Sequence, residues 1–127
     1  METQTNIGDK AIGTKESEKQ KLEPAKVKIV NFRVEPVSKS KADKVVFEVK
    51  HPNRDDLINI STANVLKNKA VITAGTWLNY DEDELIVKNS QLAYLMNFLG
   101  AKTLNEMKDK ECETEMDDKG YLCFKAY

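Results

Sequence analysis

Ten side chains in this chain of 127 residues have the chemistry to hold a single strand of nucleic acid. Most of them are cationic and attract phosphate groups whatever the base sequence. Two are aromatic and offer a ring face on which an unpaired base can stack. We therefore predict a binding site made of Lys26, Lys28, Arg33, Lys39, Lys41, Lys44, Lys50, Arg54, Trp77 and Tyr80.

The charged residues are unevenly spread along the chain, although the net charge is only −1. Residues 19–54 contain ten basic and four acidic residues, a net of +6, whereas residues 81–118 contain four basic and eleven acidic residues, a net of −7. Such asymmetry can mark one face for a polyanion. The alternative is that these charges are simply solvated surface residues and bind no partner, and for any single charge cluster this is the favoured interpretation.

The aromatic residues of the predicted site have a second interpretation. Strand alternation sends Trp77 to one face and Leu78 and Tyr80 to the other, or the reverse. An outward ring beside lysines is the pattern on which single-stranded bases stack. For Trp77 taken alone, the favoured interpretation is instead that it forms the centre of the core.

The remaining reactive side chains do not form a catalytic or metal-binding motif. His51 is the only histidine and has no neighbouring serine or cysteine in the sequence. Cys112 and Cys123 are too few for a zinc site, and the acidic run 81–84 does not continue as a calcium-binding loop. We expect no catalytic residue, no metal and no cofactor, and a protein that is not an enzyme.

Alternating apolar residues predict β-strands over much of the chain. In residues 25–37 the alternation starts with Val27 and Ile29 and slips by one residue at Val30, which predicts a bulge or a sharp bend. Residues 44–50 alternate without a break and should pair with this first strand. Further strands or hairpins are predicted at 57–60, 70–73, 76–88 and 110–127.

One helix is predicted at residues 90–100, where Leu92, Leu95, Met96 and Leu99 form an apolar stripe. Asn89 or Ser90 can cap its start, and Gly100 can close its end in the left-handed conformation. Two single turns are also expected. Ser61 or Thr62 would cap one through Leu66, and Thr103 and Glu106 have the spacing of a capping box for the other.

The last hairpin carries both cysteines. Residues 118–120 fit a three-residue loop with Gly120 in the left-handed position. The resulting register sets Thr114 opposite Phe124 and sends Cys112 and Cys123 to opposite faces, which excludes a disulfide between them. Cys112 is expected to be the more buried of the two.

The chain should contain a tail and one domain. Residues 1–25 have few large apolar side chains and no periodicity, so we expect a disordered N-terminal tail followed by a single β-rich domain, 26–127. No apolar run approaches the roughly 20 residues that span a bilayer, and the N-terminus lacks the apolar core of a secretory signal. We expect a cytoplasmic protein with no membrane partner.

These elements predict a mainly β fold with one to two short helices, arranged as a small OB-like Greek-key barrel. The alternative is an open α+β sheet with one helix on its face. The helix falls later than the usual place between the third and fourth strands if each short strand is counted separately.

The order of elements also resembles a known family. The helix ending in Leu99-Gly100, the turn at Leu104, the start Lys108-Asp109-Lys110 and the hairpin at Gly120-Tyr121 resemble small OB-fold single-stranded DNA-binding proteins of phages and archaeal viruses. The resemblance implies a module that binds single-stranded nucleic acid in replication, recombination or repair. The alternative is a protein–protein interaction module or a virion structural component, which would use the acidic residues 81–118 and exposed strand edges. Either could form a homo-oligomer.

Overall fold

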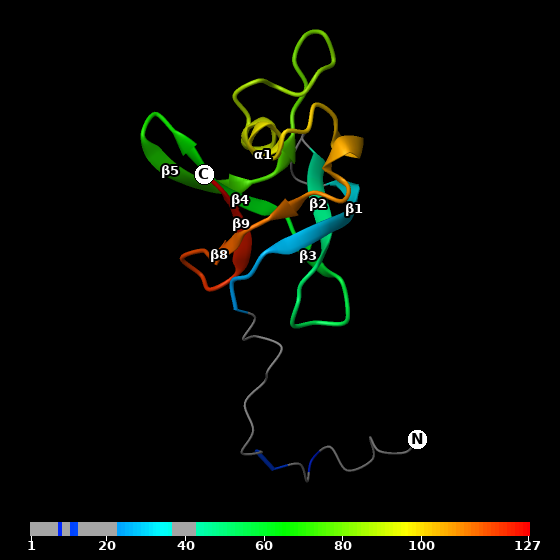
Figure 1. Ribbon diagram of the computed structural model, residues 1–127, viewed down its shortest axis with the longest axis vertical. Helices are drawn as coiled ribbons and strands as arrows, with labels where there is room; N and C mark the ends of the chain where they lie inside the picture. Colours follow the sequence, from blue (N-terminus) through cyan, green and yellow to red (C-terminus); the bar gives the residue numbers. More distant parts are fainter. Residues whose placement is uncertain (1–7, 9–10, 13–22, 37–42) are drawn as a thin grey trace.

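The computed structural model describes residues 8, 11–12, 23–36 and 43–127, and the body of the protein is built almost entirely of short strands (Figure 1). The first five strands are β1 (Val27–Pro36), β2 (Asp43–Lys50), β3 (Ile58–Ile60), β4 (Thr62–Lys67) and β5 (Ala70–Gly75). They are followed by β6 (Trp77–Leu78), the helix α1 (Gln91–Leu99) and the 3₁₀ turn η3 (Leu104–Met107). The chain ends with β7 (Glu111–Cys112), β8 (Thr114–Met116) and β9 (Leu122–Ala126).

The strands close into an OB-like barrel once two interruptions are recognised. One sheet has the order β3-β2-β1-β7, with β6 also beside β2, and the other has the order β5-β4-β9-β8. Strands β3 and β4 form one continuous extended segment that is interrupted only at Ser61. Strands β7 and β8 likewise form one segment interrupted at Glu113, and the Glu113 carbonyl still accepts a hydrogen bond from the Lys125 amide at 2.8 Å. The two sheets therefore share both broken strands and surround one core.

This closure also explains the place of the helix. The closed ring consists of β1, β2, β3–β4, β7–β8 and β9, and β5 and β6 are additional strands. Counted within this ring, α1 lies between the third and fourth strands, which is the usual position for an OB-fold. The pairing of β4 with β9 is parallel, whereas the other strand pairs are antiparallel. The mainly β barrel predicted from the sequence is confirmed, and the open α+β sheet is not observed.

The bend predicted in the first strand is present. The register between β1 and β2 shifts between Ile29 and Asn31, which marks a bulge at Val30. The bulge lets Ile29 stay buried while the rest of the strand turns along the barrel. Inside, the Phe47 ring of β2 meets the Phe124 ring of β9 edge to face at 5.6 Å, so that the core joins the two sheets.

The helix has the predicted limits. Ser90 is the residue that caps it, because its side-chain oxygen accepts from the Ala93 amide, and Gly100 ends it with φ 76°. Leu92 and Leu95 point into the core without exposure. The Gln91 amide nitrogen donates to the carbonyls of Ala63 and Ile72, which fixes α1 to the β4–β5 hairpin.

The helical turn expected after Ser61 is wrong, because residues 62–67 form strand β4. This strand turns directly into β5 through Asn68 and Lys69, which both have positive φ, 50° and 68°. Two positive φ values in a two-residue loop are typical of a type I′ turn, whose twist matches that of the strands. The capping box at Thr103 is confirmed, and its Glu106 carboxylate accepts from the Lys102 amide at 2.8 Å.

The folded body begins before the expected boundary at residue 25. The Ala25 backbone exchanges hydrogen bonds with the Thr114 hydroxyl at 2.9 and 2.6 Å, and the buried His51 ring donates through Nε2 to the Glu23 carbonyl at 2.8 Å. These contacts hold residues 23–25 against the barrel. The rest of the expected tail, apart from Gly8, Ala11 and Ile12, lies outside the described residues.

Candidate nucleic-acid interface

Trp77 lies on the outer surface of the barrel, against Lys44. Strand β6 joins the edge of β2, where Trp77 is opposite Lys44, and Lys44 is opposite Glu35 on the other side. The Lys44 ammonium lies 5.4 Å from the centre of the indole ring. A partly exposed tryptophan beside a lysine offers a base both a ring face and a charge for its phosphate.

The interpretation of Trp77 as the centre of the core is wrong. Leu78 is the residue of β6 that enters the core, with 7% of its surface exposed, and Trp77 is not a member of the buried cluster. Gly75 makes room for the indole, since a Cβ at that position would lie 3.0 Å from Trp77 Nε1. A side chain at position 75 would therefore press against the indole ring.

Arg33 lies in the middle of the same outer face and joins three strands. Its guanidinium donates to the Glu48 carboxylate at 2.9 Å and to the Asn59 side-chain oxygen at 3.3 Å. It also donates to Glu35 at 2.7 Å, and this hydrogen bond is the largest contribution that raises the pKa of Arg33 above its usual value. Arg33 is thus already paired with carboxylates. It links β1, β2 and β3, and little of its positive charge is left for a phosphate group.

Three further predicted cations gather at the opposite end of β2. Lys28 is directly opposite Lys50, and the Lys50 ammonium donates to the carbonyl of Arg54. Since Lys44 and Lys50 are six residues apart on one strand, the two ends of this face are separated by roughly 20 Å. The face therefore carries cations at both ends, with the paired Arg33 between them.

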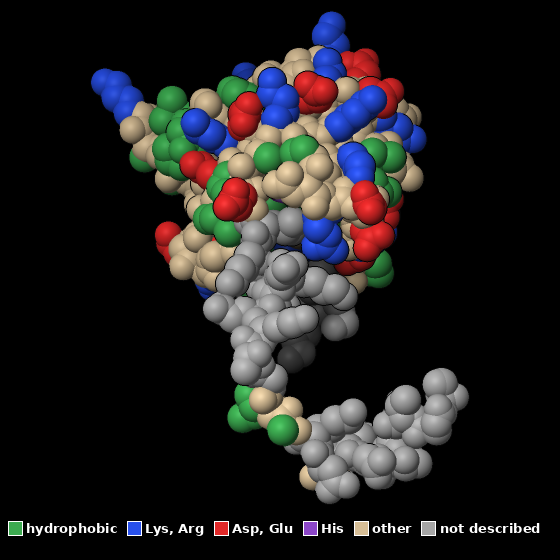
Figure 2. Space-filling model, turned by 60° about the horizontal axis from the view of Figure 1, so that its bottom comes forward, with side chains coloured by type: hydrophobic (Ala, Val, Ile, Leu, Met, Phe, Trp, Pro, Cys, Tyr) green, Lys and Arg blue, Asp and Glu red, His purple; other side chains and the backbone are tan. Residues whose placement is uncertain are grey.

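The basic and acidic halves of the sequence are not segregated in space. Pairing of β1 with β7 brings them together: the Lys26 ammonium is 3.9 Å from Glu113, and the Lys28 ammonium is 3.7 Å from Asp109. Arg54 likewise lies 3.9 Å from Asp56. Figure 2 shows Lys and Arg side chains interspersed with Asp and Glu on the face that it presents, with no continuous area of one charge.

Tyr80, also predicted for the site, is not brought to this face. Tyr80 is 61% exposed and forms an isolated bridge with Ile86, in the loop that precedes α1. Lys39 and Lys41 lie outside the described residues. One aromatic that the prediction omitted is Tyr121, 69% exposed, in the loop between β8 and β9. Its place just after the turn glycine, Gly120, was the available signal.

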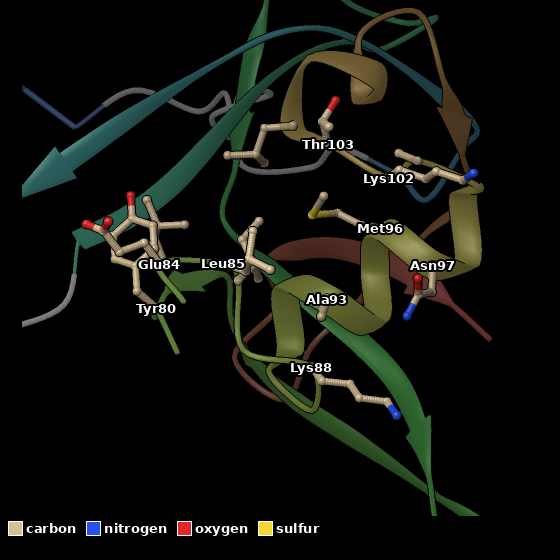
Figure 3. Close-up of a pocket in the computed structure, with 13 residues that line it drawn as sticks. Tyr80, Glu84, Leu85, Lys88, Ala93, Met96, Asn97, Lys102 and Thr103 are labelled. Atoms are coloured by element: carbon tan, nitrogen blue, oxygen red, sulfur yellow. The ribbon is translucent and has the colours of Figure 1, made fainter. Parts of the chain in front are cut away.

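Tyr80 instead lines a groove between residues 78–88 and α1 with η3, of about 570 Å³ (Figure 3). Leu85 and Met96 point toward its centre, whereas the ammonium ends of Lys88 and Lys102 extend away from it. The volume suits a small ligand. Its lining contains no histidine or cysteine, and hence no pairing of a nucleophile with an imidazole base.

The two cysteines are free thiols, as predicted, and both are buried, so the expected difference in their exposure is not seen. Cys123 has no exposed surface and Cys112 has 3%. Burial raises the pKa of Cys112 to about 12 and that of Cys123 to about 11, so both are protonated near neutral pH.

No group of three or more potential metal ligands among His, Cys, Asp and Glu occurs in the described part of the chain. Among the same residues, no helix is long and apolar enough to cross a membrane. Comparison with protein-family models, with curated proteins and with solved structures finds no match for this chain.

Proposed function

We propose that this protein is a non-enzymatic module that binds single-stranded nucleic acid on the outer face formed by β1, β2 and β6. The observation that carries the proposal is the position of Trp77, outside the core and under the Lys44 ammonium. Ligands of OB-folds lie on the face of the second and third strands, between the loops that join strands one to two and four to five. Lys44 is on the second strand of this barrel.

The charges of the face favour a single strand bound by few phosphate contacts. Lys44 and Lys50 contribute ammonium groups without a carboxylate partner among the described residues, whereas Lys26 and Lys28 are near acidic side chains. Such exposed pairs are weak, worth about 0–1 kcal/mol, so a phosphate can replace the carboxylate. The acidic partners of Lys26, Lys28 and Arg33 predict a modest affinity that depends on stacking as well as on charge.

We also propose a likeness to small OB-fold single-stranded DNA-binding proteins of phages and archaeal viruses. The closed strand order and the place of α1 agree with that family's architecture. A role in replication, recombination or repair follows from the likeness. Tyr121, in the loop between the fourth and fifth strands of the barrel, is a second stacking residue in this proposal.

The proposal is tested by titrating the fluorescence of Trp77, which is the only tryptophan in the chain. Single-stranded oligonucleotides of roughly 15–30 bases exceed the site size of one OB-fold and should quench the emission to saturation. Duplexes of the same sequence should quench it far less, because their bases are already stacked. Absence of quenching and of binding at low salt would refute the proposal.

The competing function is a protein-interaction module, and the groove of Figure 3 is the observation that favours it. Its lining is largely apolar, and the loop beside it carries the exposed acidic residues Asp81, Glu82, Asp83 and Glu84. Its partner would be a segment with apolar side chains next to lysine or arginine. Such a peptide should broaden NMR signals of Met96 and Leu85 rather than those of Trp77.

A further inference from the structure

Strand β5 is an unprotected sheet edge. It is the last strand of its sheet and pairs only with β4 among the residues that the structure describes. Its six residues, Ala70–Gly75, include no charge and no proline. Natural proteins usually guard exposed edges with lysine, proline or a bulge, because the unpaired backbone groups recruit another strand.

The backbone groups at this edge can be identified from the hairpin. In a two-residue type I′ hairpin the flanking residues, here Lys67 and Ala70, form a hydrogen-bonded pair, and such pairs alternate along the ladder. Ile72 and Ala74 are therefore bonded to β4. The N–H and C=O groups of Val71 and Thr73 point away from it, and no described residue bonds to them.

Apolar side chains surround this edge. Val71 is 45% exposed, Ile72 39%, and the neighbouring Leu66 of β4 52%. Phe98, 49% exposed, is on the stripe of α1 that also contains Gln91, the residue bonded to Ile72. The hairpin projects from the barrel in Figure 1, and Figure 2 shows hydrophobic side chains gathered on the same side of the molecule.

We propose that the protein forms a two-fold symmetric dimer in which β5 pairs antiparallel with β5 of a second copy, with Ile72 at the axis. In this register the free backbone groups of Val71 meet those of Thr73 in the other copy, and the reverse, which gives four hydrogen bonds. Ile72 meets its own counterpart as a close, non-hydrogen-bonded pair. The edge is thus complementary to itself, as a two-fold interface requires.

Charge selects the antiparallel arrangement. Lys67 and Lys69 lie at the tip of the hairpin. A parallel pairing would place these lysines side by side with those of the second copy. The antiparallel pairing separates the two tips by roughly 20 Å, beyond the screening length of about 8 Å at physiological salt.

Cysteine cross-linking tests the register. In the proposed dimer, Ile72→Cys places two thiols at directly opposed positions about 4.5 Å apart at Cα, a distance that a disulfide spans. Mild oxidation should therefore give a covalent dimer quickly. The control is Leu57→Cys, at a site that is 45% exposed and belongs neither to β5 nor to the groove of Figure 3. The buried native thiols do not compete. Equal cross-linking rates for the two variants would overturn the proposal.

Sedimentation without nucleic acid tests the dimer itself. The wild type should show reversible dimerisation with concentration. Val71→Pro removes an edge N–H that β4 does not use, so the fold should persist while association is lost. Leu57→Lys, at an exposed position outside both β5 and the groove, should leave association unchanged. Ile72→Lys should abolish it by placing two ammonium groups at the axis. A wild type that stays monomeric at every concentration would show that another partner, or none, covers β5.

Discussion

Trp77, the only tryptophan of the chain, lies at the surface, and its neighbour Leu78 enters the core. Strand alternation predicted that Trp77 and Leu78 face opposite ways, which is correct. Sequence alone could not choose between the two phases, because both side chains are apolar. The choice depends on the side of β2 that β6 joins, which is set by contacts distant in sequence.

Replacing Gly75 with alanine should displace the indole. The added Cβ would lie 3.0 Å from Trp77 Nε1, closer than side chains normally approach, whereas its 3.5 Å distance to the Lys44 Cε carbon is an ordinary contact. We expect a shifted emission maximum and easier quenching by acrylamide, with the barrel still folded by circular dichroism. Gly8→Ala is the control, since its Cβ meets nothing within 4 Å. Identical spectra for Gly75→Ala and wild type would contradict the packing described.

The buried thiol of Cys123 should make stability depend on alkaline pH. Burial raises its pKa from 9.0 to about 11 in the folded protein. Because the folded pKa is the higher one, the stabilising contribution is complete below pH 9 and is lost as the pH rises toward 11. The unfolding free energy of wild type should therefore fall more steeply over this range than that of Cys123→Ala. Parallel curves from denaturant titrations would show that the thiol is accessible.

At the scale of elements, the features predicted correctly from the sequence are those set by interactions between residues close together in the chain. The helix limits, the capping box at Thr103, the bulge near Val30 and the register of the last hairpin all follow from neighbouring residues, and all are observed. The helical turn expected after Ser61 does not form, and the chain instead turns back at Asn68-Lys69, a two-residue loop that lacks the glycine typical of such turns. Pairing with β9, more than 50 residues away, settles that segment as a strand.

The cap of α1 offers a matched pair of variants. Both Asn89 and Ser90 could have capped the helix, and the structure assigns the cap to Ser90 through its bond to the Ala93 amide. Ser90→Ala should lower the unfolding free energy by about 1 kcal/mol. Asn89→Ala should change it much less, because the Asn89 contact to Lys67 uses the backbone carbonyl. Urea unfolding of both variants decides, and equal losses would count against the assignment.

At the scale of the whole molecule, barrel closure determines both the candidate site and its charge. The sequence indicated a basic first segment and an acidic second one, but it could not show that β1 and β7 are neighbours. That pairing places Glu113 near Lys26 and Asp109 near Lys28, so much of the positive charge is locally balanced. The cations most available for phosphate are therefore on β2 itself, at Lys44 and Lys50.

Salt dependence of oligonucleotide binding tests the proposed function most directly. The binding constant of a labelled single strand is measured by fluorescence anisotropy at several salt concentrations. Its logarithm should fall with the logarithm of the salt concentration with a slope of about 0.7 per phosphate contact, or roughly 2 to 3.5 for three to five contacts. Lys44→Gln should lower this slope, whereas the control Lys88→Gln, beside the groove, should not. Trp77→Ala should weaken binding by on the order of 1–3 kcal/mol at every salt concentration and leave the slope unchanged. If the folded protein binds no single strand at low salt, or binds it equally well without Trp77 and Lys44, the outer face of β2 is not a nucleic-acid interface.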